Sequence, residues 1–254
     1  ADKHNYKWEF QNNKYYGTPY EVDERVFFDG VELFMNKISG IKPRKYQVDS
    51  VFQALKEYRK TIVSPTGSGK SLIIYSICRY LKSIGKRTLI VVPTKSLVEQ
   101  MYKDFADYGW DVEENCHRIY QGHTIDTKAP VTISTYHSIY ALQKGWYRQF
   151  DGVIGDECHQ FKAKVLQGIM KKMPDAKWRI GLTGTLDGKN VNRLILEGMF
   201  GPVFKTTSSS DLMEKGFLAK LKVQIKIVKH EPKKFDTYND EIEYLGESVS
   251  RNHY

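Results

Sequence analysis

Residues 64–73, SPTGSGKSLI, limit the fold more than any other stretch of this 254-residue chain. The β-branched run KTIV precedes them and predicts a buried strand. The run SLIIYSICRYLKSIG follows, with apolar residues at helical spacing and Gly85 where a helix would end. A glycine-rich loop between a strand and a helix is the setting of a phosphate-binding loop. The alternative is a glycine-rich turn with a surface lysine, which does not explain why strand, loop and helix all agree.

The loop offers a donor for each part of a bound polyphosphate. Successive backbone N–H groups at the start of a helix wrap a phosphate, and the lysine faces the β- and γ-phosphates. The hydroxyl that follows the lysine binds Mg²⁺. The predicted nucleotide-binding residues are Thr66, Gly67, Ser68, Gly69, Lys70 and Ser71. One position departs from the full pattern, because Ser64 stands where the pattern has glycine.

Charge and composition narrow the class of partner. Lys and Arg number 39 against 30 Asp and Glu, a net charge of +9 that favours nucleic acid, although solubility alone is another explanation. The three cysteines are odd in number and far apart, which indicates a reducing compartment without a disulfide framework. No apolar run approaches the roughly 20 residues that cross a bilayer, so we expect no membrane partner.

Strand-like and helical runs alternate from Pro43 to about Leu221. This order predicts an α/β fold, a parallel sheet with helices on both faces. Ligands bind such sheets beyond the carboxyl ends of the strands, and the motifs fall there. The run SLVEQMYKDFADYG predicts a helix that begins with a capping box of Ser96 and Glu99.

The two ends of the chain differ from this alternating region. Residues 1–40 are rich in Tyr and Phe, and DERVFFDGVELFMNKI predicts one amphipathic helix within an accessory segment that packs on the main domain. We expect the main domain to span 41–230, with LKVQIKIVKH as a further strand, and a polar connector to span 231–254.

A second motif, FDGVIGDECHQ, ends a predicted strand in two adjacent acids. Asp156 would join the Mg²⁺ coordination shell, and Glu157 would polarise the water that attacks the γ-phosphate. An Asp-Glu pair at a strand end is more often a pair of surface residues without a catalytic role. Downstream of a phosphate loop, in an alternating chain, the pair is better explained as metal ligand and base. The predicted catalytic residues are therefore Lys70, Asp156 and Glu157, and the predicted magnesium ligands are Ser71 and Asp156.

The segments PTGSGKS, DECH and LTGT, in this order, resemble the superfamily 2 helicases and translocases. The segments DECH, GMFGPVFK and LMEKGFLAKLK resemble those of phage recombination helicases of the UvsW-like group. The resemblance runs from about Pro43 to Lys222 and implies a RecA-like first motor domain that uses ATP and Mg²⁺.

The resemblance also implies roles for residues outside the two motifs. Gln47 would bond the adenine edge with help from Arg44, or it is an ordinary polar residue at a helix start. Three residues would link hydrolysis to motion, with the threonine hydroxyls bonding the histidine, unless TGT is only a tight turn: His159, Thr183 and Thr185. Five would grip a nucleic-acid backbone, unless the hydroxyls are helix caps: Thr94, Lys95, Ser134, Thr135 and His137.

The function implied by the resemblance is ATP-driven movement on DNA, at branched recombination or replication intermediates, although no residue here distinguishes DNA from RNA. A second RecA-like domain would supply arginine fingers, so we expect this chain alone to hydrolyse ATP poorly. The implied location is the cytoplasm, that of the host if a phage encodes the chain. Two alternatives stay open: the motor of a restriction endonuclease, whose nuclease cluster we do not find, and a nucleotide-gated nucleic-acid-binding module without motor action.

Overall fold

The computed structural model describes residues 24–161, 163–186, 190–219 and 234–246. The chain divides into two compact units, residues 1–218 and 219–254. The first holds the sheet and both motifs. The second contains one described helix, α11 (Tyr238–Tyr244), which buries none of its residues.

The first unit is built on a seven-stranded sheet in which every described pair of neighbouring strands is parallel. The spatial order is β3-β4-β2-β5-β6-β1-β7. Strands β2, β4 and β5 are buried along their whole length, as in β2 with the sequence TLIVV, because a parallel sheet is covered on both faces. The predicted parallel α/β fold is therefore confirmed. The strands are β1 (Arg59–Val63), β2 (Thr88–Val92), β3 (Cys116–Ile119), β4 (Val131–Thr135), β5 (Gly152–Gly155), β6 (Trp178–Thr183) and β7 (Val203–Lys205).

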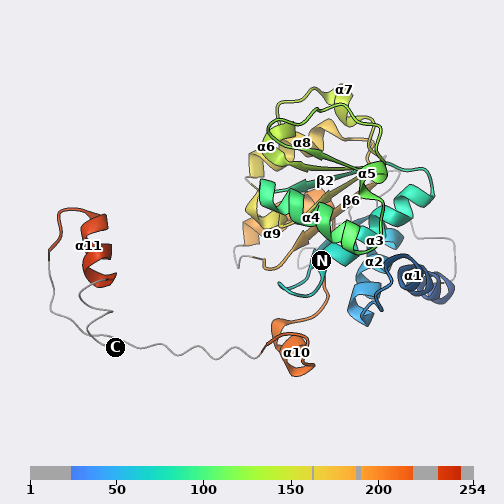
Figure 1. Cartoon of the computed structure of the whole chain (residues 1–254), viewed down its shortest axis with the longest axis horizontal. Coiled ribbons are helices and arrows are strands. Elements are labelled where there is room, and N and C mark those ends of the chain that lie inside the picture. The colour runs from blue at the N-terminus through green and yellow to red at the C-terminus, as the bar shows by residue number, and fades with distance from the viewer. Residues whose placement is uncertain (1–23, 162, 187–189, 220–233, 247–254) are drawn as a thin grey trace, which may run out of the picture. The chain divides into compact units, whose positions relative to one another are not determined.

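Helices cover both faces of this sheet (Figure 1). Successive side chains of a strand point to opposite faces. Ile90 and Val92 of β2 accordingly join one core, and Leu89 and Val91 join the other. The first core includes α1 (Glu24–Ser39), α2 (Lys45–Glu57), α3 (Lys70–Ser83), α4 (Lys95–Asp107) and α5 (Val112–Asn115). The second includes α6 (Tyr136–Ile139), α7 (Lys144–Tyr147), α8 (Ala163–Lys172) and α9 (Asn190–Phe200), while α10 (Ser209–Glu214) follows β7.

The expected amphipathic helix near the amino terminus is α1. Val31 and Met35 of α1 are buried in the first core, against α2 and α3. The predicted packing on the main domain is thus confirmed for this helix. Residues 1–23 and the whole of the predicted strand LKVQIKIVKH, residues 221–230, lie outside the described residues.

The helix ends test two predictions of the sequence. The helix after the phosphate loop stops where expected, because Gly85 takes a φ of 70° and the Lys86 N–H bonds the Leu81 carbonyl. The capping box of Ser96 and Glu99 is wrong. Helix α4 begins two residues earlier, where the Thr94 hydroxyl accepts the Leu97 N–H at 3.3 Å.

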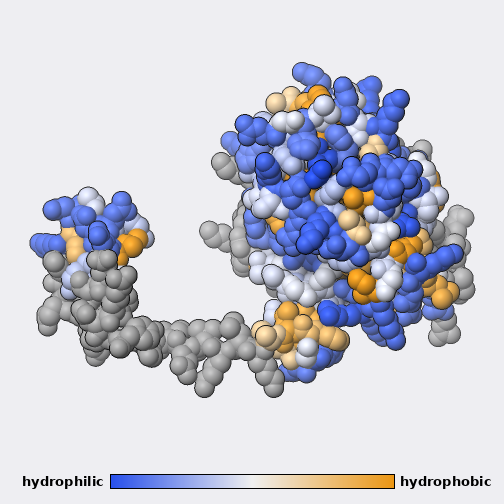
Figure 2. Space-filling view, in the orientation of Figure 1, coloured by the Kyte–Doolittle hydropathy of each residue, from blue (hydrophilic) through white to orange (hydrophobic). Residues whose placement is uncertain are grey.

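Hydrophilic side chains cover most of the visible face of the sheet unit (Figure 2). No helix within the described residues combines the length and the apolar character that crossing a bilayer requires.

Candidate nucleotide site and nucleic-acid face

The predicted nucleotide site lies at the carboxyl ends of three neighbouring strands. β1 runs into the phosphate loop, β5 into Asp156 and Glu157, and β6 into Thr183. Because these parallel strands are adjacent in the order β5-β6-β1, their carboxyl ends lie side by side. Residues of the loop, of α4 and both acids line a cavity of about 300 Å³ there.

The loop has the backbone geometry that a phosphate cradle needs. Gly67 and Gly69 take φ values of 77° and 79°, a left-handed conformation that favours glycine. Gly69 also caps α3, so the free N–H groups of the helix start face the cavity region. Ser64, the departure from the glycine pattern, is fully buried, and its hydroxyl lies 2.7 Å from that of Ser68. The buried Ser64 side chain therefore stabilises the loop through its contact with Ser68.

Lys70 and Glu157 form an ion pair. Lys70 Nζ lies 3.1 Å from Glu157 Oε1, and the two side chains are 12% and 18% exposed. The Gly184 N–H donates to the other carboxylate oxygen, Oε2, at 3.4 Å. The backbone of Glu157 takes a φ of 46°, which is uncommon outside glycine and indicates local strain. The structure thus brings together the loop lysine and the predicted base.

Asp156 fits a magnesium ligand. It is 6% exposed, and its Oδ1 has no hydrogen-bond partner among the described residues. Burial, and then the charge of Glu157, raises the pKa of Asp156 to about 6. An unpartnered buried carboxylate oxygen beside the phosphate loop is the hard oxygen donor that Mg²⁺ prefers.

Two residues beside Ser71 were not predicted from the sequence, Tyr108 and Asp104. The Tyr108 hydroxyl lies 2.8 Å from the Ser71 hydroxyl, and Asp104 lines the same cavity. Burial raises the pKa of Asp104, and its hydrogen bond with Ser71 partly offsets this. Their spacing of four residues, one turn of α4, is the only signal that the sequence offers.

Asp156→Asn is expected to stabilise the metal-free fold at pH 8, by about 1–3 kcal/mol. The pKa of Asp156 rises from an ordinary 3.8 to about 6, so the folded chain binds its proton more tightly than the unfolded chain. The native carboxylate therefore becomes more costly as pH rises through this window, and the amide avoids that cost. Urea unfolding in EDTA measures the gain, which should shrink as pH falls toward 4. An equal gain at both pH values contradicts this explanation.

The predicted contact between the second motif and TGT is present. Thr183 Oγ1 lies 2.6 Å from His159 Nδ1 and donates to the Thr185 carbonyl at 2.7 Å. The hydroxyl that bonds the histidine is therefore that of Thr183, and Thr185 takes part through its backbone. The ends of β5 and β6 are joined by this chain of contacts.

The predicted adenine-binding residues are engaged within the chain. Gln47 is buried at the start of α2, where its amide accepts from the Arg44 N–H at 2.8 Å and donates to the Ser68 carbonyl at 2.9 Å. This is the geometry of the alternative interpretation, a polar residue at a helix start, and it ties α2 to the phosphate loop.

The surroundings of Arg44 include an aromatic residue that the sequence analysis missed. The Arg44 guanidinium lies 4.0 Å from the ring centre of Phe217. The next residue, Leu218, packs so close to Gly67 that a Cβ there would meet it at 2.5 Å. The segment GFL thus contacts both the phosphate loop and the predicted adenine side.

The candidate nucleic-acid residues lie at the carboxyl ends of β2 and β4, of which β2 pairs with β5 and β4 pairs with β2. Thr94, Lys95 and His137 are exposed. Ser134 is fully buried and donates to the Ile119 carbonyl at 3.0 Å, and the Thr135 hydroxyl lies 2.8 Å from that of Ser138. These two hydroxyls are occupied within the fold. The Thr94 hydroxyl caps α4, as the alternative interpretation expected.

Comparisons with known proteins agree with this fold. Residues 40–188 match the family described as "Type III restriction enzyme, res subunit". The ATP-dependent DNA helicase uvsW of Enterobacteria phage T4 is 34% identical over 84% of this chain and 44% of its own length. The DNA 3'-5' translocase XPB2 of Sulfurisphaera tokodaii is 30% identical over 85% of this chain and 47% of its own length. The chain thus spans less than half the length of these curated relatives.

Solved structures give the same result. The crystal structure of the UvsW helicase from bacteriophage T4 superposes with a TM-score of 0.65 at 32% identity, over 74% of this chain and 69% of that one. A second T4 UvsW structure gives 0.66 at 28% identity, over 89% and 47%. The chain therefore belongs to the type III restriction enzyme res subunit family, and its sheet unit is a RecA-like motor domain of the superfamily 2 helicase type.

Proposed function

We propose that this chain is the first motor domain of an ATP-dependent DNA helicase or translocase. The ion pair of Lys70 with Glu157, beside the unpartnered oxygen of Asp156, carries the proposal. These three groups are the lysine, the base and the metal ligand that phosphoryl transfer from a nucleotide requires. The names of the relatives, a DNA helicase and a DNA translocase, support the same activity.

Different residues of the chain would have different roles in ATP hydrolysis. Bound Mg²⁺·ATP supplies the γ-phosphoryl group and the metal charge that stabilises it. The loop residues would hold the phosphates, while Ser71 and Asp156 would hold the metal. Lys70 would pair with the phosphates in place of Glu157, and the Glu157 carboxylate would then be free to accept the proton of the attacking water. Before the nucleotide binds, the lysine neutralises the base.

Coupling to movement would pass through His159, Thr183 and Thr185. Their contacts join the end of β5, which carries Glu157, to the end of β6. A change at the γ-phosphate position would therefore shift two strand ends together. The nucleic-acid face, after β2 and β4, lies next to them in the sheet order.

We further propose that residues 41–230 form this motor domain, that 231–254 connect it to a second RecA-like domain, and that the pair forms the complete motor. The relatives support this, because the chain spans only 44% of the T4 helicase. The proposed substrate is branched DNA rather than RNA, and the proposed location is the cytoplasm.

The family description supports a second candidate, the motor of a restriction enzyme. The sequence of this chain shows no nuclease carboxylate-lysine cluster, so we place it second. An assay of the complete motor on circular duplex DNA decides, since the helicase account predicts no cleavage under conditions in which ATP is hydrolysed.

Lys95→Ala is expected to weaken DNA binding by the same factor for all sequences, because a phosphate contact positions without reading bases. Losing one phosphate contact should also lower the slope of log affinity against log salt by about 0.7–0.9. Fluorescence anisotropy with labelled DNA over a salt series measures both effects. Lys37→Ala, an exposed lysine of α1, is the matched control. Unchanged affinity and slope for Lys95→Ala would remove this residue from the DNA-binding face.

A further inference from the structure

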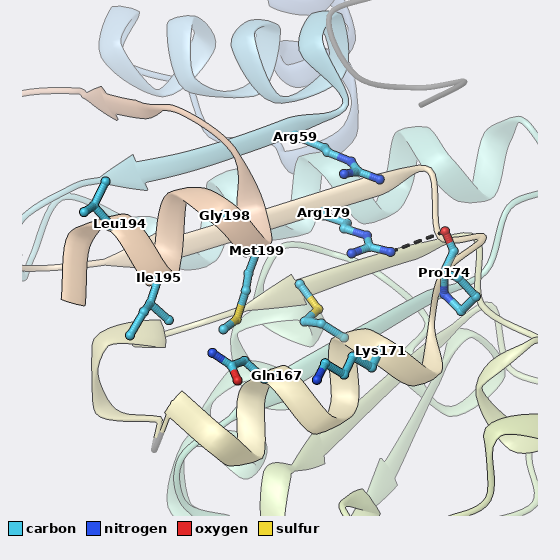
Figure 3. Close-up of a pocket in the computed structure, with 10 residues that line it drawn as sticks. Arg59, Gln167, Lys171, Pro174, Arg179, Leu194, Ile195, Gly198 and Met199 are labelled. Atoms are coloured by element: carbon cyan, nitrogen blue, oxygen red, sulfur yellow. Dashed lines mark hydrogen bonds between the residues drawn. The ribbon is translucent and has the colours of Figure 1, made fainter. Parts of the chain in front are cut away.

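Two of the hollows in the sheet unit differ in how their polar groups are used. One, of about 600 Å³, lies between α8 and α9 (Figure 3). There the Arg179 guanidinium already donates to the Met173 and Pro174 carbonyls. In the cavity at the phosphate loop, by contrast, polar side chains at the end of α4 lie beside Ser71, the proposed magnesium ligand. These side chains have no role yet in the proposed hydrolysis.

Asp104 and Tyr108 lie one helical turn apart, on the same side of Ser71. Tyr108 Oη lies 2.8 Å from Ser71 Oγ. Asp104 lines the cavity together with Ser71, and the Ser71 hydroxyl donates to its carboxylate. Asp156 Oδ1 has no partner among the described residues, so Ser71 does not bond this atom. The Ser71 hydroxyl is therefore held from the carboxyl end of α4.

The position of Tyr108 is fixed by the core. Its N–H donates to the Asp104 carbonyl at 3.0 Å, which keeps both residues in the last turn of the helix. Its carbonyl accepts from the Tyr75 hydroxyl at 3.3 Å, and the two ring centres lie 5.2 Å apart. Tyr75 is fully buried in α3, near the start of which Ser71 lies. One helix therefore carries Ser71 and also holds Tyr108 in place.

The hydrogen bonds of the Ser71 hydroxyl suit a metal ligand. A serine hydroxyl has one proton and two oxygen lone pairs. Because Ser71 gives its proton to Asp104, the Tyr108 hydroxyl is the donor in its own contact and uses one lone pair. The other lone pair stays available for Mg²⁺. A cation on the oxygen also makes the hydroxyl a stronger donor, which strengthens its bond to the carboxylate.

We propose that Asp104 and Tyr108 are positioning residues, which orient the Ser71 hydroxyl for Mg²⁺ and so raise the affinity for ATP when Mg²⁺ is present. This assignment rests on the proposed nucleotide site. Partners that orient a metal ligand typically change metal affinity by about 10–100-fold. A carboxylate such as that of Asp104 can also bind Mg²⁺ directly, and a direct ligand would act without Ser71.

Calorimetry of ATP binding to the full chain, in Mg²⁺ and in EDTA, gives the factor by which Mg²⁺ raises the affinity. Tyr108→Phe should lower this factor about 3–10-fold, because it removes one hydrogen bond. Asp104→Ala should lower it about tenfold or more. Asp104→Asn should keep more of the factor than Asp104→Ala, since its amide oxygen still accepts the serine proton. The affinity in EDTA should not fall in any of the three.

Two residues of α4 offer matched controls. Tyr102→Phe removes a hydroxyl that bonds Glu113 at 2.7 Å, and Asp107→Asn removes an exposed carboxylate. Neither residue lines the cavity at the phosphate loop, so both variants should keep the parent's factor. Thermal melting without nucleotide checks that every variant folds.

The decisive comparison combines Tyr108→Phe and Asp104→Ala, each in turn, with Ser71→Ala. Once the serine hydroxyl is gone, neither change should lower the factor further. An effect of the same size with and without Ser71 would overturn the proposal, as would a factor that Tyr108→Phe leaves unchanged. If Mg²⁺ does not raise the affinity of the parent chain, the proposed nucleotide site fails together with this assignment.

Discussion

Glu157→Gln is expected to bind Mg²⁺·ATP at least as tightly as the parent and to lose turnover by about 10²–10⁴-fold. The amide keeps the shape of the side chain but cannot accept the proton of the attacking water. It also releases Lys70 from the ion pair at 3.1 Å, so the lysine no longer exchanges one anion for another when nucleotide binds. The substitution should therefore abolish most ATP turnover without lowering the affinity for ATP.

Calorimetry on this chain measures the affinity of Glu157→Gln, and phosphate release by the complete motor measures its turnover. Glu32→Gln, an exposed carboxylate of α1, is the control and should match the parent in both. If Glu157→Gln hydrolyses ATP at the parent rate, another group is the base.

Lys70→Ala is expected to weaken ATP binding by about 10–100-fold, because it removes a charge-assisted hydrogen bond to the phosphates. The change also leaves Glu157, which is 18% exposed, without its cation, so some loss of fold stability is expected. A thermal melt separates the two effects, since a folded variant with weak nucleotide binding isolates the phosphate contact. Equal affinities for variant and parent would disprove the phosphate-loop assignment.

Much of the fold could be predicted because its signals are local. The strand, glycine loop and helix around Lys70 are neighbours in the chain, and the alternation of runs indicates a parallel sheet. The acids after β5 could be placed by the same reasoning, because the carboxyl ends of parallel strands share one edge.

The remaining features of the site depend on contacts between residues that are distant in the sequence, so they could not be predicted from it. Ser71 and Tyr108 are 37 residues apart, and only the packing of α4 on α3 brings them together. Whether Ser134 is exposed depends on the pairing of β4 with β3, whose Ile119 carbonyl it bonds. The start of α4 was misplaced because Thr94 and Ser96 are both good caps, and their hydroxyls lie 2.9 Å apart.

The pairing of Arg59 with Arg179 shows the same limit in the sheet. A sequence of alternating strands does not give the order in which they pair, so two distant arginines could not be expected to meet. The order β5-β6-β1 places them in register.

DNA-dependent phosphate release tests the central claim, that this nucleotide site drives movement on DNA. The assay compares the complete motor, this chain alone and the complete motor with Glu157→Gln, each with and without branched DNA. The account predicts release that DNA stimulates in the complete motor, little release from this chain alone, and none above background in the variant. Release that ignores DNA, or that persists in the variant, would contradict it.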